Sequence, residues 1–319
     1  MKTGLLLDPL FTRHRPGSHH PEAPGRIEAI IRELESRQLP AKCAALAPRD
    51  ITDDEILRCH TDAYLKTVLR EIDGQHFGEL STGDTRFGPE SLDTARQAAG
   101  GLLNAVDAVF AGEVRNAFCA VRPPGHHATA SRGMGFCIFN NAALAARHAR
   151  AVHGAERVAI IDWDVHHGNG TQDIFYEDGG VFYFSTHQHP WYPGTGMTGE
   201  TGAGAGKNTT LNHPLPAGTG MEAIEKAFRD DFAKKMKDYR PDLVIVSAGF
   251  DSRLGDPLGD FRLTDADFAG LTKILAELAG EFAGGRLVSV LEGGYRQEGL
   301  AQAVATHVET LIAAAAASG

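Results

Sequence analysis

Two carboxylates and two imidazoles lie within a run of six residues near the middle of the chain, Asp162-Trp163-Asp164-Val165-His166-His167. The run follows an apolar stretch, 158–161, which is typical of a buried parallel strand with functional groups at its carboxyl end. In an extended chain, side chains two residues apart point the same way, so Asp164 and His166 can face one ion. Such a mixed oxygen and nitrogen set suits zinc, with an open position if only one more protein ligand arrives.

Three further polar clusters follow predicted strands elsewhere in the chain. They are Arg122-Pro123-Pro124-Gly125-His126-His127, Ala248-Gly249-Phe250-Asp251 and Glu292-Gly293-Gly294-Tyr295. Taken singly, a paired-histidine loop, an Asp that anchors a turn and a Tyr that packs all have ordinary structural interpretations. Because ligands in open α/β sheets collect at the carboxyl ends of the strands, the four clusters together predict one site at one edge.

The elements expected to position these clusters alternate between strand and helix. Apolar runs predict strands at 4–8, 116–121, 158–161, 181–185, 208–212, 243–247 and 287–291. Apolar periodicity and caps predict helices at 27–37, 62–72, 91–111, 141–153, 171–175, 221–239 and 264–282, with a capping box at 52–55 and a last helix that runs into a frayed Ala-rich tail. Without a linker or an internal repeat, this order predicts one α/β domain, 1–319, with a mainly parallel sheet between helices.

Composition narrows the class of protein. The chain has 319 residues, 42% hydrophobic and 23% charged, as in ordinary globular proteins. A formal net charge of −10 argues against general nucleic-acid binding and mildly favours cationic substrates. Cysteines at 43, 59, 119 and 137 form no C-x-x-C pair and are expected to be reduced thiols. No secretory signal and no apolar run of transmembrane length is recognised, so we expect a cytoplasmic protein without a membrane partner.

The four clusters resemble those of the zinc-dependent histone deacetylases and their bacterial relatives, which include the acetylpolyamine amidohydrolases and the acetoin-utilisation proteins. The resemblance runs from about His20 to Tyr295. Trp163 and the run Gly168-Asn169-Gly170-Thr171-Gln172 are most similar to the class II branch. The resemblance implies an arginase/deacetylase-type α/β/α fold and one zinc ion per chain, whose ligands would be Asp164, His166 and Asp251.

The resemblance also implies roles for catalytic residues. His126 and His127 match the tandem active-site histidines, with His127 as general base and then acid. His126, held by Asp162, would be the electrostatic partner of His127. Tyr295 matches the tyrosine that donates a hydrogen bond to the substrate oxygen. Asn169 stands where class I relatives have Asp, and this neutral partner should make His127 easier to keep neutral.

Further positions are predicted to line the substrate tunnel. Phe136 and Tyr192 resemble the two aromatic walls of the acyl-lysine tunnel, although each could instead pack in the core or a loop. Gly135 would let the backbone approach the substrate stem, or only make a turn. Asp84 could grip the substrate backbone or a cationic group, or be a solvated loop residue. Leu258 stands where polyamine-selective relatives carry Glu, which favours acyl-lysine in a protein or peptide over an acetylated polyamine.

A structural potassium ion is also implied by the resemblance. Its ligands would be the Asp162 side chain, backbone carbonyls of Asp164 and His166, and Ser185. A second cation site is considered near Phe175, Asp178 and Val181. Arg26 would either line an inner channel behind the zinc or pair with a buried carboxylate.

Two rival functions follow from the same residues. A ureohydrolase needs two manganese ions and additional Asp ligands, but Arg253 stands two residues after Asp251, so that site is short of ligands. The other rival is a relative that binds an acyl ligand without hydrolysing it, and the intact zinc ligands, both histidines and Tyr295 argue against it. The oligomeric state is left open.

Overall fold

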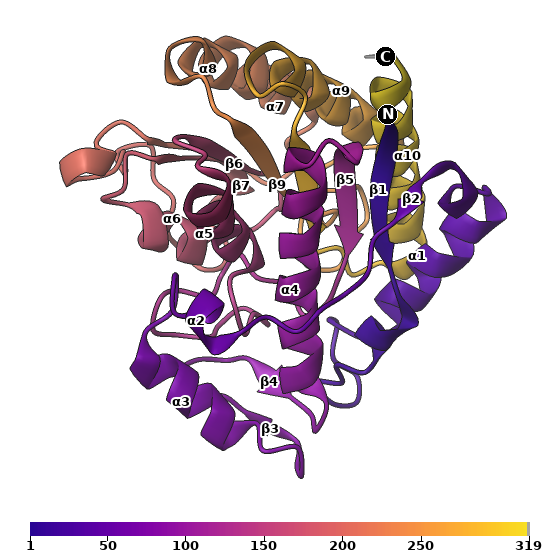
Figure 1. Ribbon diagram of the computed structural model, residues 1–319, viewed down its shortest axis with the longest axis vertical. Helices are drawn as coiled ribbons and strands as arrows, with labels where there is room; N and C mark the ends of the chain where they lie inside the picture. The colour runs from indigo at the N-terminus through magenta and orange to yellow at the C-terminus, as the bar shows by residue number, and fades with distance from the viewer. Residues whose placement is uncertain (318–319) are drawn as a thin grey trace.

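The computed structural model describes residues 1–317 and builds them around an eight-stranded sheet (Figure 1). In spatial order the strands are β2 (Ala44–Ala45), β1 (Lys2–Leu7), β5 (Val114–Ala120), β10 (Leu287–Leu291), β9 (Leu243–Ala248), β6 (Val158–Asp162), β7 (Val181–Gln188) and β8 (Thr210–Leu215). All seven neighbouring pairs are parallel. The predicted parallel α/β sheet is therefore confirmed.

Helices cover both faces of the sheet and give the predicted three layers (Figure 1). One face carries α4 (Ser91–Phe110), α5 (Asn141–His153) and α6 (Asn169–Phe175). The other carries α1 (Gly25–Ser36), α9 (Asp265–Phe282), α10 (Gln297–Ala317) and the segments α7 (Met221–Lys226), η4 (Ala227–Phe232) and α8 (Ala233–Tyr239). Smaller elements are α2 (Asp53–Ile56), α3 (Asp62–Glu71), the hairpin β3 (Gly78–Glu79) with β4 (Arg86–Phe87), and the 3-10 turns η1 (Pro9–Thr12), η2 (Pro40–Lys42) and η3 (Gly204–Gly206).

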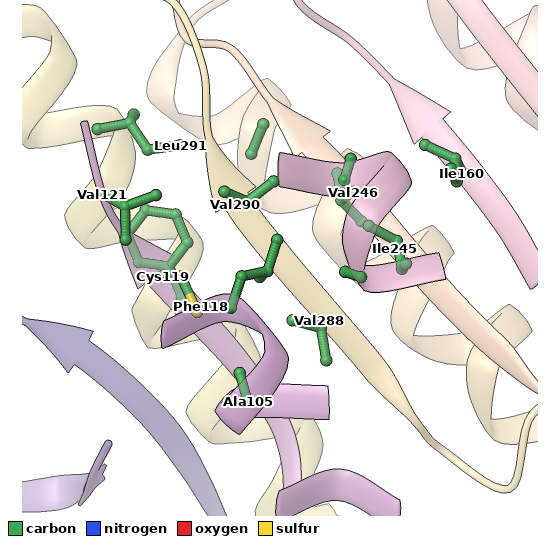
Figure 2. Close-up of a cluster of buried hydrophobic side chains, with 14 of the residues drawn as sticks. Ala105, Phe118, Cys119, Val121, Ile160, Ile245, Val246, Val288, Val290 and Leu291 are labelled. Carbon is green, nitrogen blue, oxygen red and sulfur yellow. The ribbon is translucent and has the colours of Figure 1, made fainter. Parts of the chain in front are cut away.

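The central strands are apolar because both of their faces are covered. Every residue of β6, β9 and β10 is buried. Figure 2 shows part of this core, where side chains of β5, β10 and β9 pack together with Ala105 of α4. Strands that are buried on both faces read as continuous apolar runs, which is why they were predictable from the sequence. Apart from Ser247 of β9 and Ser289 of β10, the polar residues stand at the ends of these strands or just after them.

Several boundaries differ from the predictions. The predicted helix 221–239 is interrupted by the π-helical segment η4, in which Phe228 and Phe232 both contact the ring of Phe184, at centroid distances of 4.9 and 4.7 Å. The predicted strand 208–212 lies further along, because β8 stays paired with β7 up to Leu215. The tail predicted to fray is helical through Ala317, and residues 318–319 lie outside the described part.

α10 also corrects the expectation about membrane-length segments. By length and composition alone, this helix is apolar enough to cross a membrane. Half of the most apolar stretch of this helix is buried, and the helix packs against α1, α9, β1 and β5. Core helices of globular domains can be equally long and apolar, and the contacts of α10 are those of a core helix.

His307 of α10 is buried, and it contacts residues close to the carboxyl ends of β6 and β9. Its Nδ1 hydrogen-bonds with Thr272 Oγ1 at 2.7 Å and its Nε2 with Ser289 Oγ at 2.8 Å. The ring also contacts Trp163 and Phe250, the residues before two of the predicted metal ligands, at centroid distances of 5.5 and 6.0 Å. Burial lowers the pKa of His307 to about 3. The folded chain therefore keeps this imidazole neutral.

We expect His307 to make the fold less stable as the pH falls from 6.5 towards about 3, because over this range the unfolded chain takes up a proton that the folded chain does not. One such proton is worth about 1.4 kcal/mol per pH unit. Urea unfolding of the wild type and of His307→Gln, which keeps a hydrogen-bonding side chain but does not titrate, measures the effect. The stability advantage of the wild type should shrink between about pH 7 and about pH 5. A constant difference would show that His307 protonates alike in both states.

Candidate active site

The four polar clusters follow β5, β10, β9 and β6, which are four consecutive strands in the middle of the sheet. Because these strands are parallel, their carboxyl ends lie at one edge. Sheet topology therefore brings together residues that are far apart in the sequence, such as Gly125 and Glu292, which are 167 positions apart and share a hydrogen bond. This edge is where open α/β sheets bind ligands.

Asp164, His166 and Asp251 converge at this edge. Their ligand atoms all lie within 4.8 Å of one another, and all three residues are buried. His166 Nδ1 lies 3.0 Å from Asp164 Oδ1 and 3.2 Å from Asp251 Oδ2. Zinc binds such donors at about 2.0–2.2 Å, so donors around a tetrahedral ion are separated by roughly 3.3 Å. The one imidazole and two carboxylates therefore fit a zinc ion in both chemistry and spacing.

Backbone N–H groups hold both carboxylates in place. Asp164 Oδ1 accepts from His166 N at 2.9 Å, and Asp164 Oδ2 accepts from Gly293 N at 2.8 Å. Asp251 Oδ1 accepts from Val165 N at 2.9 Å. A Cβ on Gly293 would lie 2.0 Å from Asp251 Oδ2 and 2.6 Å from Asp164 Oδ2. Only glycine lets the loop after β10 approach both carboxylates this closely.

The charges of Asp164, His166 and Asp251 do not fully balance one another. Burial and the nearby charge of Asp164 raise the pKa of Asp251 to about 7. Burial lowers the pKa of His166, but its hydrogen bonds to Asp164 and Asp251 outweigh that effect and raise it to about 10. Neighbouring buried carboxylates disfavour each other's ionised forms, and a divalent cation would remove that conflict. The charges of the three groups thus favour a bound divalent cation, as their spacing does.

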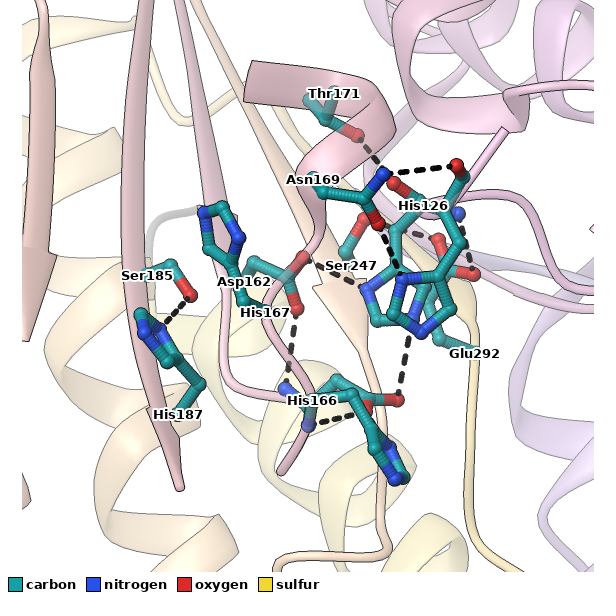
Figure 3. A network of polar contacts seen from close by, with 12 residues as sticks. His126, Asp162, His166, His167, Asn169, Thr171, Ser185, His187, Ser247 and Glu292 are labelled. Atoms are coloured by element: carbon teal, nitrogen blue, oxygen red, sulfur yellow. Dashed lines mark hydrogen bonds and ion pairs between the residues drawn. The ribbon is translucent and has the colours of Figure 1, made fainter. Parts of the chain in front are cut away.

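The two tandem histidines have different partners. His126 Nδ1 pairs with Asp162 Oδ2 at 2.9 Å (Figure 3). His127 Nδ1 pairs with Asn169 Oδ1 at 2.8 Å. Burial lowers the pKa of His126, but the charges of Asp162 and Asp164 raise it well above its usual value. Burial and the charge of His126 lower the pKa of His127 well below its usual value. The arrangement therefore offers one imidazolium and one neutral imidazole side by side.

Glu292 ties the histidine loop to two strands, a role that the sequence analysis missed. Its Oε2 accepts from Gly125 N at 2.6 Å and from His126 N at 3.1 Å. Its Oε1 accepts from Ser247 Oγ at 2.9 Å (Figure 3). Burial raises the pKa of this carboxyl to about 7. The signal in the sequence was a carboxylate directly after a buried strand whose other residues, apart from Ser289, are apolar.

Arg26 holds the loop that carries Tyr295. Its Nε donates to Gly294 O at 2.6 Å, its Nη2 to Glu292 O at 2.5 Å and its Nη1 to Glu22 Oε1 at 2.9 Å. Its guanidinium lies 5.1 Å from the centre of the Tyr295 ring. Of the two interpretations offered for Arg26, pairing with a buried carboxylate is the one seen. Burial raises the pKa of the Tyr295 hydroxyl well above its usual value, so the hydroxyl stays a donor.

Asp256 was also missed, although it fixes two sides of the pocket. Its Oδ2 accepts from Tyr295 N at 2.7 Å and from Arg296 N at 3.1 Å, and its Oδ1 accepts from Leu258 N at 3.0 Å. One carboxylate therefore joins the loop of Tyr295 to the loop of Leu258. In the sequence it is only an Asp in a Gly-Asp-Pro turn.

A pocket opens over the convergent donors. Its lining contains all five predicted tunnel residues and consists of Asp84, His127, Gly135, Phe136, His166, Trp191, Tyr192, Leu258 and Tyr295. Trp191 was not predicted. Its Nε1 donates to Leu258 O at 2.8 Å, which closes one side of the rim. A tryptophan within the long loop 187–206 was the available signal.

Asp84 braces the other side of the rim. Its Oδ1 accepts from Gly135 N at 2.7 Å, and its Oδ2 accepts from the Tyr192 hydroxyl at 3.2 Å. Gly135 has φ of 57°, and a Cβ there would lie 2.2 Å from the His127 ring. Phe136 also has a positive φ, 69°, which is uncommon for a bulky residue. The backbone is therefore held in a costly conformation that places an aromatic ring at the pocket wall.

The predicted potassium ligands are neighbours across two strands. Asp162 pairs with Ser185 in the register of β6 and β7. Asp162 Oδ1 accepts from Asp164 N at 3.2 Å, and its Oδ2 accepts from the Tyr183 hydroxyl at 3.2 Å. Ser185 Oγ hydrogen-bonds with His187 Nδ1 at 2.9 Å (Figure 3). The potassium site stays a prediction.

The second predicted cation site surrounds Asp178. Its carboxylate forms ion pairs with Arg147 and Arg150, the latter at 2.8 Å. Asp178 N donates to Phe175 O at 3.0 Å, and Val181 N donates to Asp178 O at 3.3 Å. Two guanidinium groups thus already compensate the side chain, so a cation there would depend on backbone carbonyls. This site also stays a prediction.

Known proteins resemble this chain in sequence over most of its length. The family model of the histone deacetylase domain matches residues 20–311. The chain is 40% identical over 309 residues to "Histone deacetylase 14, chloroplastic" of Arabidopsis thaliana, covering 92% of this chain and 73% of that protein. It is 40% identical over 302 residues to "Polyamine deacetylase HDAC10" of Mus musculus, covering 91% of this chain and 45% of that protein.

A solved structure agrees with these matches. The crystal structure of the "HDA15 HD domain" is 36% identical, has a TM-score of 0.92, and the match covers 98% of this chain and 89% of that chain. The likeness therefore extends over almost the whole fold, including the four strand ends that carry the site. These matches support hydrolase activity on acetylated amides. The chain belongs to the histone deacetylase family.

Proposed function

We propose that this chain removes acetyl or other acyl groups from the side-chain amine of lysine in proteins or peptides, with one zinc ion held by Asp164, His166 and Asp251. The observation that carries the proposal is the convergence of these buried donors beneath an aromatic-walled pocket. Zinc supplies Lewis acidity, which polarises the amide carbonyl and makes water more acidic. A structural potassium ion beside Asp162 and a cytoplasmic location belong to the same proposal.

The residues around the donors supply proton transfer. His127 Nδ1 is engaged by Asn169, so its Nε2 is the atom that takes a proton from the attacking water. The same nitrogen then gives the proton to the leaving lysine amine, and acetate is the other product. His126, kept positive beside Asp162, stabilises the negative charge that develops. The Tyr295 hydroxyl donates to the substrate oxygen as that oxygen becomes more negative.

The lining of the pocket favours an acyl-lysine stem. Phe136, Tyr192, Trp191 and Leu258 give it a largely apolar wall that suits the neutral methylene chain of lysine. Asp84 is the lining carboxylate, and it already accepts from Gly135 N and the Tyr192 hydroxyl. A polyamine would bring further ammonium groups, which need carboxylates to replace their hydration.

An acetylated polyamine is the second candidate substrate. The printed name of the mouse relative describes a polyamine deacetylase. The pocket lining also offers the Asp84 carboxylate and the rings of Phe136, Trp191 and Tyr192, which can attract an ammonium group. A third candidate, binding of an acyl ligand without turnover, predicts zinc and ligand binding with no hydrolysis.

Steady-state kinetics of the zinc-loaded chain on an acetyl-lysine peptide and on acetylspermidine tests the proposal. We expect the larger kcat/KM on the peptide, because the rim lacks a Glu at the position of Leu258. The reverse order would identify a polyamine deacetylase. Binding of zinc and of both compounds with no hydrolysis of either would contradict the enzymatic proposal itself.

Leu258→Glu, with Leu258→Gln as the neutral control, isolates the rim charge in the same experiment. The added carboxylate should raise kcat/KM on acetylspermidine about fivefold relative to the control, which corresponds to about 1 kcal/mol for a solvated pair of charges. The Trp191 contact uses the backbone carbonyl of residue 258, so neither substitution removes it. An equal response of peptide and polyamine would show that this position does not face the substrate.

Asn169→Asp tests the pairing of His127. A carboxylate stabilises an imidazolium more than an amide does, by about 1 kcal/mol, so the pKa of His127 should rise by about 0.7 units. Because the neutral imidazole is the active form, the acidic limb of the kcat/KM profile should move to higher pH by that amount. Asn169→Ala, which removes the partner, serves as control and should not move the limb upward. An unmoved limb in Asn169→Asp would count against this pairing.

A further inference from the structure

A second group of potential metal ligands lies on the helices, away from the candidate active site. Asp107 Oδ1 is 2.7 Å from His148 Nε2 and 2.6 Å from His153 Nε2, and the ligand atoms all lie within 4.8 Å of one another. Among residues 1–317, this group and the one at the strand ends are the two with such spacing. Asp107 is near the end of α4 and both histidines are near the end of α5.

The order of elements places this group at the opposite edge of the sheet. α4 leads directly into β5, and α5 leads directly into β6. The ends of both helices therefore lie near the amino ends of those strands, whereas the candidate active site lies at the carboxyl ends. α4 and α5 pack against each other on one face, as Figure 1 shows. A metal bound here would not share ligands with the proposed zinc site.

The ring orientations are fixed by packing as well as by the shared carboxylate. His153 stacks on Phe110 with ring centroids 4.6 Å apart and an interplanar angle of 3°. Gly154 follows in the left-handed conformation and ends α5 directly after His153. His148 is buried, and its other nitrogen, Nδ1, lies 3.9 Å from Glu55 Oε1. The Nε2 atoms of His148 and His153 therefore both point towards the Asp107 carboxylate.

We propose that Asp107, His148 and His153 form a site for a divalent transition metal of the zinc, cobalt or nickel type. Two imidazoles and one carboxylate are the donor set that such ions prefer over calcium or magnesium. The side chains of Asp107 and His153 are 43% and 22% exposed, so water can complete the coordination and the ion can enter. The inference does not rest on the proposed deacylation.

Binding requires a small rearrangement. Each imidazole nitrogen now shares a hydrogen bond with Asp107 Oδ1, so the metal must displace a proton from each Nε2 to the Nδ1 of the same ring. The Nδ1 proton of His148 would then face Glu55. Arg58 Nη1, which lies 3.3 Å from that Nδ1, opposes this tautomer and the added positive charge. Arg58 also lines an open pocket with Arg147 and Arg150, which gives it room to move aside.

Metal titration of the metal-free chain, residues 1–319, tests the inference. Zinc binding is measured by equilibrium dialysis with metal analysis, and cobalt binding by its visible absorption spectrum. We expect two equivalents in the wild type and one in Asp107→Asn, which keeps a hydrogen-bond acceptor, and in His153→Phe, which keeps a ring on Phe110. Asp251→Asn, which loses a ligand of the proposed catalytic site, should retain one equivalent that disappears in the double variant Asp107→Asn/Asp251→Asn.

A further variant distinguishes a metal site from a simple tie between two helices. Arg58→Gln should tighten binding of the helix-site equivalent severalfold, because it removes the opposing charge, and should leave the other equivalent unchanged. Unfolding of Asp107→Asn without metal reports whether the fold is intact. A wild type that binds one equivalent, lost in Asp251→Asn and kept in Asp107→Asn, would overturn the inference and leave only the hydrogen-bonded tie.

Discussion

Compensation of negative charge at the carboxyl ends of three parallel strands, β6, β9 and β10, is the constraint on which the rest of this structure depends. Asp162, Asp164, Asp251 and Glu292 are all fully buried there. Ionised carboxylates in such surroundings are costly unless they are paired or hydrogen-bonded. Backbone N–H groups and two imidazoles supply part of the compensation, and the proposed cations would supply the remainder. The proposed zinc ion and His126 take part both in this compensation and in the proposed chemistry, whereas His127, which would move the proton, lies beside them as a neutral imidazole.

A second buried ion network supports that edge from the N-terminal loop. Arg122, which begins the loop after β5, forms a two-point pair with Glu22, with Nη2 at 2.7 Å from Oε2. Glu22 also pairs with Arg26, which holds the backbone around Gly294. The Glu22 carboxylate thus helps to fix both the loop after β5 and the loop after β10. Burial opposes ionisation of Glu22, but Arg122 and His14 hold its pKa well below its usual value.

A feature could be predicted from the sequence when neighbouring residues decide it, and could not when it depends on residues far away in the chain. Buried strands and the capping box at Thr52 were predictable because a few neighbouring residues decide them. The candidate ligands were predictable because Asp164 and His166 are two residues apart and resemble a known motif. The roles of Glu292 and Asp256 were not, since their partners come from loops far away in the sequence. The Asp107 group was missed for the same reason, because its members lie 41 and 46 residues apart.

Zinc-dependent stability in Asp107→Asn, which leaves only the strand-edge site, tests the central claim most directly. Thermal unfolding and hydrolysis of an acetyl-lysine peptide would be followed after chelation and after one equivalent of zinc is restored. The account predicts that chelation abolishes hydrolysis and lowers the melting temperature, and that zinc restores both. At a free zinc concentration of roughly 100 times Kd, the bound ion should stabilise the fold by about 2.7 kcal/mol. Hydrolysis and a melting temperature that respond to neither treatment would contradict it.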